Sequence, residues 1–418
     1  MSQFSIKLYK SKKKGEEDKV LFFTFVPLYG TRYMKVGLIS FHSFLQPGGV
    51  KRHILGLHQE LKKRGIQSKI IVPRRSQSEN YGKEVILLGT SFPLGLSGTQ
   101  GDFCINFNPF AIKKVLQKEK FDVLHFHNCG FPSTLQILEW SKALNILTFH
   151  ANLEKTSFFK VFPGFLHIFN KLVQWKIDGV IGVAPLNLKI FKYYQGPKTV
   201  IPNGIDLNEF NPQVPPIRKF STSNGASAKL NILFLGRIEE RKGLIYLLKA
   251  LKILNKKFKN LRLIVVGEGP LKPECRKWAE KNKLKNVIFE RPVSQKEIPS
   301  YYKTADIYCS PAIYGESFGI VLIEAMAVGV PVCAFANKGY KGVLEKGKGK
   351  RFLAKPKDYK ALAQKLAILI KSEKLRKEMG KWGQKEAKKY SWPKITDQVL
   401  AFYELCQREK EAKNAKFS

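Results

Sequence analysis

Two glutamates flank a stretch of the chain that could bind a phosphate group. Glu316 and Glu324 lie eight positions apart, around a glycine-containing turn and an apolar run without helix breakers. The pattern predicts a helix that Ser317 caps and Gly329 ends. The first N–H groups of a helix have no partner within it and carry the positive end of its dipole, so they can bind an anion.

The start of this helix also predicts the kind of ligand. Phe318, Gly319 and Ile320 would offer backbone N–H groups, and glycine at 319 lets a ligand approach the main chain closely. A phosphate would repel nearby carboxylates, so we expect Glu316 and Glu324 to bind hydroxyl groups on either side of it. A ligand with hydroxyls on both sides of a phosphate is a nucleotide sugar. The alternative is a buried amphipathic helix whose glutamates are merely solvated.

Two basic residues supply the charge that such a ligand needs. Arg237 and Lys242 flank a short turn after a strand predicted over residues 230–235. Paired cations can bind a diphosphate and stabilise the negative charge that develops on it when a sugar leaves. This chemistry needs no metal, and the sequence has neither an Asp-x-Asp pair at a strand end nor an ATPase-type phosphate-binding loop, so we expect no metal and no cofactor. For Arg237 the alternative is a surface ion pair with Glu239 or Glu240.

Glycines and a histidine follow predicted strands in the first half of the chain. Gly48 and Gly49 come after a strand that begins at Met34, and a run with helical periodicity follows them. Ligands bind at such sheet edges, although a Gly-Gly pair alone is a weak signal. His150 ends the strand predicted over residues 146–150, beside a loop where its side chain could reach a substrate.

Two further histidines are of a type that metals use as ligands. His125 and His127 alternate along another predicted strand, and Cys129 follows closely. These residues could bind zinc, but no fourth ligand is evident. We interpret both histidines as core residues and assign no metal site.

The strands and helices that must position these residues form two similar series. Residues 34–205 and 229–391 each alternate short buried strands with helices, and a linker rich in Pro, Ser, Asn and Gly joins them. The pattern predicts an α/β fold of two doubly wound, Rossmann-like domains that face a central cleft. A helix over about residues 392–410 is expected to complete the first domain. We interpret residues 1–33 as a basic extension that a misassigned start would explain, because Met34 opens a clean first strand.

Composition adds a strong positive charge. The 418 residues carry a formal net charge of +40, which attracts anions such as nucleic acid, anionic lipid headgroups or a phosphorylated substrate. The sequence contains no nucleic-acid-binding motif, so we expect no specific nucleic-acid partner. The six cysteines form no Cys-x-x-Cys pair, which predicts reduced thiols in the cytoplasm. No apolar run approaches the roughly 20 residues of a membrane-spanning helix, so membrane contact would be peripheral, on the inner face.

One segment has a composition suited to a membrane surface. Residues 156–177 interleave aromatic and aliphatic side chains, beginning with Phe158 and Phe159, with lysines. A cationic, aromatic helix fits the interface of an anionic bilayer. Packing of the same side chains against their own domain is the alternative, and Pro163 and Gly164 would split the helix.

The motifs of the second half resemble those of a known enzyme family. They are similar to the nucleotide-sugar half of the retaining glycosyltransferases of family 4, which have the GT-B architecture, and the resemblance runs from Met34 to about Tyr403. The first half is most similar to the phosphatidylinositol mannosyltransferase branch of that family. The matching stretches are Gly236-Arg237, Arg241 to Gly243, Val265 to Gly269, Glu316 to Gly319, Glu324 to Ala327, Gly329 to Pro331, Pro47 to Gly49, His125, His127, Thr148 to His150 and Pro202 to Asp206.

The resemblance implies how a donor would be bound. Arg237 and Lys242 would bind the donor diphosphate. Glu324 would bind the ribose hydroxyls, and Glu316 the transferred hexose. The main-chain N–H groups would come from Phe318, Gly319 and Ile320.

The resemblance also implies roles in the first half and a reaction course. Gly49 would approach the phosphates and the acceptor, and His150 would contact the reacting sugar. Retention would follow from a front-face substitution in which the leaving phosphate helps to deprotonate the acceptor. The implied partners are a nucleotide sugar donor, a lipid- or glycan-linked acceptor and an anionic membrane surface.

The acceptor and the sugar are less closely specified. The branch uses an arginine in the loop after the second strand region to hold an inositol phosphate, whereas this chain has residues 97–102 there, ending in Asp102, and an aspartate cannot bind that phosphate. A different lipid- or polyprenyl-linked acceptor is compatible with the sequence, and the branch favours mannose as the hexose. The alternative functions are a sugar phosphorylase or epimerase of the same architecture, and a non-enzymatic basic protein that binds membranes or nucleic acid.

Overall fold

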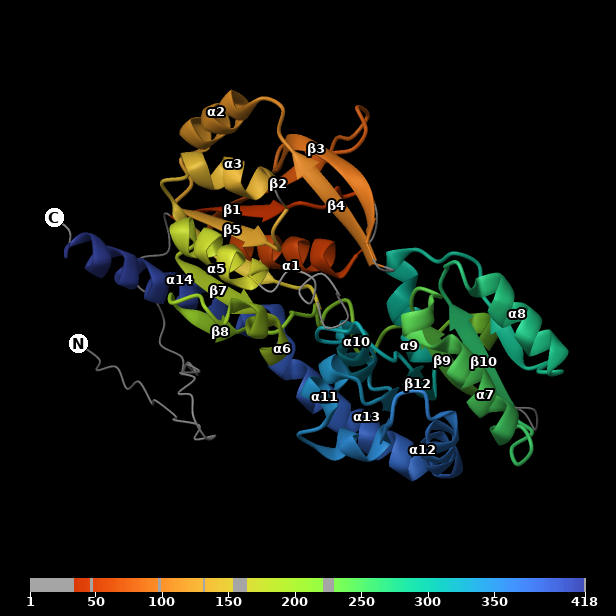
Figure 1. Cartoon of the computed structure of the whole chain (residues 1–418). Helices are drawn as coiled ribbons and strands as arrows, with labels where there is room; N and C mark the ends of the chain where they lie inside the picture. Colours follow the sequence, from red (N-terminus) through yellow and green to blue (C-terminus); the bar gives the residue numbers. More distant parts are fainter. Residues whose placement is uncertain are drawn as a thin grey trace, which may run out of the picture. The chain divides into compact units, whose positions relative to one another are not determined.

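The chain folds into two α/β units, each built on a largely parallel sheet (Figure 1). The computed structural model describes residues 34–45, 48–96, 99–130, 132–152, 164–220 and 229–416. Unit 1 contains the described residues up to Gly204 and those from Trp392 onwards, and unit 2 runs from Ile205 to Ser391. The predicted fold class, two doubly wound Rossmann-like domains, is confirmed.

The sheet of unit 1 has eight strands within the described residues, in the order β4-β3-β2-β1-β5-β6-β7-β8. Neighbouring strands are parallel except β3 and β4, which form an antiparallel hairpin that the sequence pattern did not predict. The strands are β1 (Lys35–Ser40), β2 (Gln67–Arg74), β3 (Val85–Leu96), β4 (Thr99–Ile105), β5 (Val123–His127), β6 (Leu144–Phe149), β7 (Gly179–Gly182) and β8 (Lys198–Val200).

Helices cover both faces of this sheet. On one face α1 and α14 pack over a core that includes Ile54 and Phe402, and on the other α2, α3 and α5 pack over a core that includes Ile137 and Phe169. The helices are α1 (Gly49–Lys63), α2 (Pro109–Glu119), α3 (Ser133–Trp140), α5 (Phe165–Lys176), α6 (Pro185–Leu188), η2 (Lys189–Phe191) and α14 (Trp392–Asn414). None of the helices in the described residues combines the length and the apolar character needed to cross a bilayer.

Unit 2 has a six-stranded parallel sheet within the described residues, in the order β11-β10-β9-β12-β13-β14. The core on one face lies under α7, α8 and α12. On the opposite face α9 packs with α10, and Tyr302 of α9 contacts Tyr308 of β12 with 5.1 Å between the ring centroids. The strands are β9 (Leu230–Leu235), β10 (Leu261–Val266), β11 (Val287–Phe289), β12 (Ile307–Ser310), β13 (Val332–Phe335) and β14 (Leu353–Ala354).

The helices of unit 2 connect these strands. They are η3 (Arg218–Phe220), η4 (Glu240–Lys242), α7 (Leu244–Leu254), α8 (Lys272–Lys281), η5 (Gln295–Glu297), α9 (Ile298–Thr304), α10 (Ile320–Val328), α11 (Lys338–Leu344), η6 (Lys348–Phe352), α12 (Tyr359–Lys371), α13 (Glu373–Ala387) and η7 (Lys388–Tyr390). Strand β9 has the bounds that the sequence predicted. Since β10 lies on one side of β9 and β12 on the other, the strand order reverses at the β9–β12 pair.

Trp392 packs the start of the C-terminal helix onto α1. Trp392, at the start of α14, is buried against α1, and its indole fills the space beside Gly56. A Cβ atom at position 56 would lie 2.1 Å from Cε2 of Trp392. Glycine is therefore required at this helix crossing.

We predict that Gly56→Ala destabilises unit 1. Alanine raises the helix propensity by about 1 kcal/mol, but overpacking costs about 1–3 kcal/mol, so a net loss is expected. Hydrogen exchange of α1 and α14 in the whole chain would measure it. The matched control is Gly342→Ala in α11, where no described atom lies within 4 Å of the new Cβ. Exchange in Gly56→Ala as slow as in the unchanged chain would contradict the packing argument.

Candidate functional site

Several helices that follow central strands begin with glycine. In α1, α7 and α10 the N-cap residues are Gly48, Gly243 and Gly319, and no side chain forms a cap hydrogen bond. A polar side chain caps some other helices, as Asn337 does in α11 and Asp358 in α12, whereas α5 also has a glycine N-cap, Gly164. Helices α7 and α10 follow β9 and β12, where the strand order reverses, and ligands of doubly wound sheets bind at such points.

The start of α10 differs in detail from the prediction. The expectation that Ser317 caps the helix is wrong, because Gly319 is the N-cap, with φ of +100°, and the helix begins at Ile320. A Cβ atom at position 319 would lie 2.6 Å from the ring of Tyr340, so only glycine fits. The predicted end of the helix at Gly329 is confirmed.

A series of linked ion pairs lies in the turn after β9 in unit 2. Arg237 Nε lies 3.4 Å from Glu239 Oε2, and Glu239 Oε1 lies 2.5 Å from Arg241 Nε. Arg241 Nη1 then donates to Glu316 Oε1 at 2.9 Å, and Lys242 Nζ donates to the same oxygen at 2.7 Å. This series of ion pairs contains three cations and two carboxylates, so its net positive charge attracts an anion.

The structure brings two of the predicted site residues, Lys242 and Glu316, into contact and adds Arg241. Arg237 pairs with Glu239 and not directly with Glu316, and its side chain is 44% exposed. An ion pair with Glu239 was the alternative considered for Arg237 in the sequence analysis. Arg241 was missed because three basic residues within six positions look equivalent in sequence. Only the conformation of the turn shows that Arg241 contacts Glu316, and the sequence does not give that conformation.

Glu316 is held as a carboxylate. Burial alone would raise its pKa, but the charges of Lys242 and Arg241, and the hydrogen bonds that they donate, lower it below the ordinary value of 4.5 overall. The pair of cations therefore keeps this side chain negative at neutral pH.

Glu324 lies one helical turn into α10 and faces the interior of unit 2. It is 1% exposed, and its Oε2 accepts a hydrogen bond of 2.9 Å from the hydroxyl of Tyr302. Phe318 is also buried, and its ring contacts that of Tyr390. The assignment of Glu324 to ribose hydroxyls stays a prediction.

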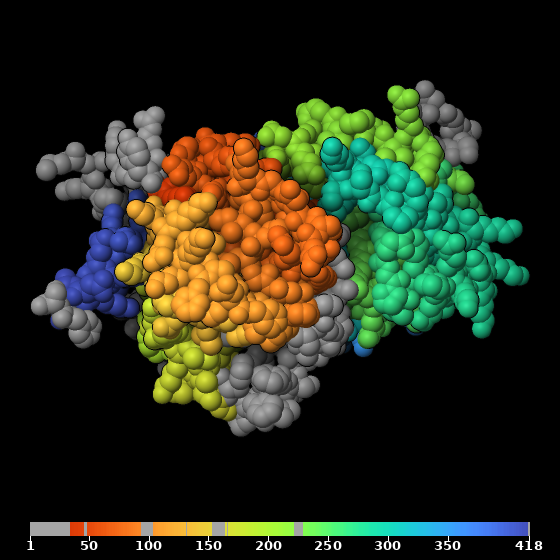
Figure 2. Space-filling view, turned by 90° about the horizontal axis from the view of Figure 1, so that it is seen from above, coloured from red at the N-terminus to blue at the C-terminus, as the bar shows by residue number. Residues whose placement is uncertain are grey.

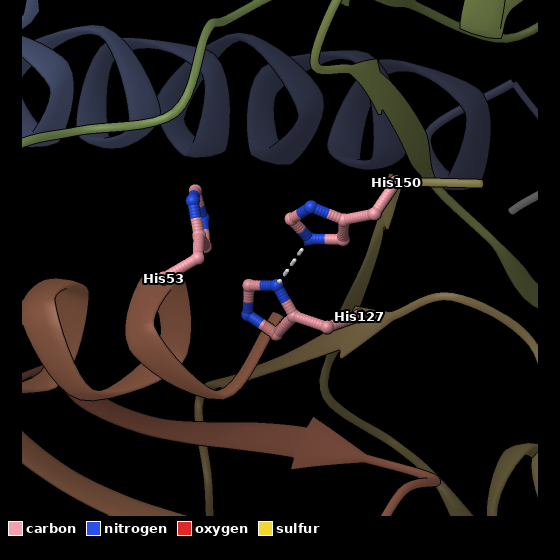
Figure 3. Close-up of side chains that lie close together, drawn as sticks. All are labelled: His53, His127 and His150. Atoms are coloured by element: carbon pink, nitrogen blue, oxygen red, sulfur yellow. Dashed lines mark hydrogen bonds between the residues drawn. The ribbon is translucent and has the colours of Figure 1, made fainter. Parts of the chain in front are cut away.

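In unit 1 the corresponding edge of the sheet carries Gly49 and a group of histidines. Gly49 is the first residue of α1, and no described atom lies within 4 Å of a Cβ built there. His53 projects from α1, His127 from the end of β5 and His150 from the residue after β6 (Figure 3). His127 Nδ1 and His150 Nε2 lie 3.1 Å apart and form a hydrogen bond.

His150 follows its strand, as expected, but it does not extend into solvent. It is 9% exposed, and its backbone N–H donates to Asn128 Oδ1 at 2.7 Å. The neighbouring ring of His127 is fully buried, and its centroid is 5.4 Å away. The sequence could not show this burial, because the covering helix α1 lies about 100 residues earlier.

The structure does not group His125, His127 and Cys129, the metal-ligand types considered from the sequence, around one point. His125 contacts Tyr403 and Thr148, with both ring nitrogens 2.6 Å from a hydroxyl, so it is a core histidine as predicted. The histidine that joins His127 and His150 is His53, whose ring centroid is 4.8 Å from that of His150. A single histidine on a helix gave no sequence signal for this contact.

Burial lowers the pKa of each histidine in this group. Desolvation lowers the pKa of His53 to about 4, with an opposing contribution from Asn203, and that of His125 to about 3. The pKa values of His127 and His150 lie well below 6.5, first because of burial and then because of the neighbouring imidazoles. All four rings are therefore neutral at pH 7.

Solved structures share this two-unit architecture. A sucrose-phosphate synthase from Thermosynechococcus elongatus superposes with a TM-score of 0.71 at 21% identity, over 90% of this chain and 100% of that one. The Anabaena protein HepE, solved in complex with UDP and glucose, gives a TM-score of 0.66 at 20% identity, over 88% of this chain and 99% of that one. The two parallel sheets and these likenesses define the class: the chain has the GT-B fold of glycosyltransferases.

The family follows from sequence comparison. The family described as Glycosyltransferase Family 4 matches residues 47–209, and that described as Glycosyl transferases group 1 matches residues 217–386. A phosphatidyl-myo-inositol mannosyltransferase of Mycobacterium leprae is 31% identical over 379 residues, which cover 89% of this chain and 96% of that one. The chain therefore belongs to glycosyltransferase family 4 and is a glycosyltransferase.

We predict that acid destabilises unit 1 before unit 2. A buried histidine whose folded pKa is depressed contributes full stability above its unfolded pKa of about 6.5, and that stability is lost as the pH falls towards the folded value, about 4 for His53. The loss is up to about 1.4 kcal/mol per pH unit for each such group. Hydrogen exchange of the whole chain between pH 6.5 and 5 would measure it.

Unit 2 is the internal control, because all seven histidines precede residue 168 in the sequence. His53→Gln should reduce the pH slope of unit 1 alone. Equal pH slopes for the two units would contradict the assignment of buried, neutral imidazoles.

Proposed function

We propose that this glycosyltransferase moves a hexose, with mannose favoured, from a nucleotide diphosphate sugar to a lipid- or glycan-linked acceptor at the cytosolic face of a membrane, with retention of configuration. The observation that carries the proposal is the shared oxygen of Glu316, which Lys242 and Arg241 approach beside the glycine start of α10. Support for a nucleotide donor comes from the Anabaena neighbour, which was solved with UDP and glucose. Support for mannose and a lipid acceptor comes from the name of the mycobacterial relative.

The ion pairs around Glu316 suit a diphosphate leaving group. Lys242 and Arg241 are 15% and 22% exposed, so they are partly desolvated and their hydrogen bonds to an anion would be strong. A diphosphate gains negative charge as the sugar departs, and these cations would stabilise that charge without a metal ion. Glu316 holds both cations in place beforehand, so little reorganisation is needed during the reaction. Glu316 would also contact the transferred hexose, and His150 of unit 1 the reacting sugar.

Helix α5 supports the proposed membrane contact. Its residues Phe169 and Val173 are buried in unit 1, but Ile168, Leu172 and Trp175 form a second apolar stripe that is 37–59% exposed. The spacing of i, i+4 and i+7 places these three on one side of the helix. The yellow-green region that includes α5 forms part of the surface in Figure 2.

Lysines border this stripe. Lys171 is exposed on the same helix, and Lys176 Nζ lies 5.4 Å from the ring of Trp175. An exposed apolar stripe with cations at its edge suits the interface of an anionic bilayer. Phe158 and Phe159, which the sequence analysis included in this segment, lie outside the described residues.

We predict that Lys242→Ala slows transfer about 10²–10³-fold, because one of two donors to the leaving group is lost. Initial rates with GDP-, UDP- and ADP-linked hexoses would measure the effect. Arg241 still holds Glu316 in this variant, so the fold should survive. Lys252→Ala is the matched control, since Lys252 is bonded to Asn282 on an exposed part of unit 2. Equal rates for both variants would contradict the proposed charge stabilisation.

Glu324→Gln tests the ribose contact separately. A carboxylate bound to a ribose diol loses about 1.5–3 kcal/mol when it becomes an amide, so the nucleotide-induced rise in melting temperature should shrink or disappear. Tyr302→Phe removes the hydrogen bond that Tyr302 donates to Glu324 and serves as the structural control. If both variants lose the same amount of nucleotide stabilisation, Glu324 acts through folding and the ribose assignment fails.

We predict that Ile168→Ser with Trp175→Ser reduces sedimentation with vesicles of phosphatidylcholine and phosphatidylglycerol. Both side chains are at least half exposed, at 59% and 52%, so the fold should not change. The control is His167→Ser with Gln174→Ser, two exposed polar positions on the same helix. Undiminished sedimentation of the first variant would remove α5 from the membrane proposal.

A further inference from the structure

Three imidazoles in unit 1 lie close enough to share one ion. His53, His127 and His150 each present a ring nitrogen, and these nitrogens all lie within 4.8 Å of one another (Figure 3). They come from α1, β5 and the residue after β6, so the sheet and the helix packed on it fix their positions. Among the described residues this is the group whose geometry fits a shared ligand.

Two nitrogens of the group are buried without a hydrogen bond. Within the described part of the chain, neither His53 Nδ1 nor His127 Nε2 has a hydrogen-bond partner. Each buried polar atom left unpaired costs about 1–3 kcal/mol. Native structures keep such groups for a reason, and an ion or ligand that is not present is a common one.

The chemistry of the group selects the kind of ion. Neutral imidazoles offer a nitrogen lone pair to a metal ion. Calcium and magnesium prefer oxygen ligands, whereas zinc and its neighbours in the first transition series prefer nitrogen. Three histidines with a fourth position open to water or substrate form a well-known zinc ligand set.

The distances require only a local adjustment. Zinc–nitrogen bonds of about 2.0–2.1 Å in a tetrahedron place ligand nitrogens about 3.3 Å apart. His127 Nδ1 and His150 Nε2 are already 3.1 Å apart, so with these ligand atoms the unpaired nitrogen that the ion would satisfy is His53 Nδ1. A separation at the 4.8 Å limit of the group must shorten by about 1.5 Å to reach 3.3 Å, which a rotation of the His53 side chain can supply.

We propose that His53, His127 and His150 form a binding site for a divalent transition-metal ion, with Zn²⁺ preferred. The ion binds to the three imidazoles and keeps one open coordination position. Because the proposed function places His150 at the reacting sugar, an occupied site competes with transfer, and zinc inhibits the enzyme. Metal binding itself does not depend on the proposed function.

The test uses cobalt(II) as a spectroscopic substitute for zinc on the whole chain, purified without a polyhistidine tag. We expect visible absorption bands of four- or five-coordinate cobalt that saturate at one ion per chain and disappear when zinc is added. His53→Gln should weaken cobalt binding more than about tenfold. His167→Gln, at an exposed position of α5, is the matched control and should bind as the unchanged chain does.

Other spectra would overturn the proposal. A strong near-ultraviolet cobalt–thiolate band would place the ion on a cysteine, and equal binding by both variants would place it elsewhere. The absence of visible bands in the unchanged chain would also reject the site, and this measurement needs no variant to fold. Transfer assays are kept separate, so a failure of the proposed transfer reaction leaves the binding result intact.

Discussion

The shared oxygen of Glu316 fixes the geometry of unit 2 at the point where its strand order reverses. Lys242 and Arg241 hold this carboxylate from the turn after β9. On the other side, a Cβ atom at Gly339 would lie 2.4 Å from the carbonyl oxygen of Glu316, so α11 packs directly on the same loop. The loop before α10 is therefore held between two elements, and the helix start beside it has a defined position. An anion that binds there meets partners that are already in place.

The electrostatics of unit 1 differ from those of unit 2. The sheet edge of unit 1 that ends in His127 and His150 carries neutral imidazoles that burial keeps from charging, whereas unit 2 carries full charges that pair with one another. Paired charges suit the binding of a charged phosphate, and neutral rings suit contact with an uncharged sugar or with a metal ion.

Local patterns predicted much of this arrangement. The alternation of buried strands and helices predicted both sheets, and the glycine at 329 predicted the end of α10. The hairpin of β3 and β4 was missed, because an antiparallel pair inside a parallel series depends on pairing between strands and not on the composition of either one. His53 was missed for a similar reason. A histidine on an amphipathic helix has no sequence feature that identifies partners 70 or more residues away.

Helix α5 shows how two interpretations of one segment can both describe part of it. The sequence left open whether its aromatic side chains pack inside the domain or face a membrane. Phe169 and Val173 pack inside the domain, whereas Ile168 and Trp175 remain exposed. A surface helix packs only one face against the core of its domain. A second apolar stripe on its other side therefore adds nothing to the stability of unit 1. Apolar surface exposed to water is unfavourable, so its presence here favours a partner outside the chain. Lysines border the stripe, and the interface of an anionic bilayer is the simplest physical match for such a surface.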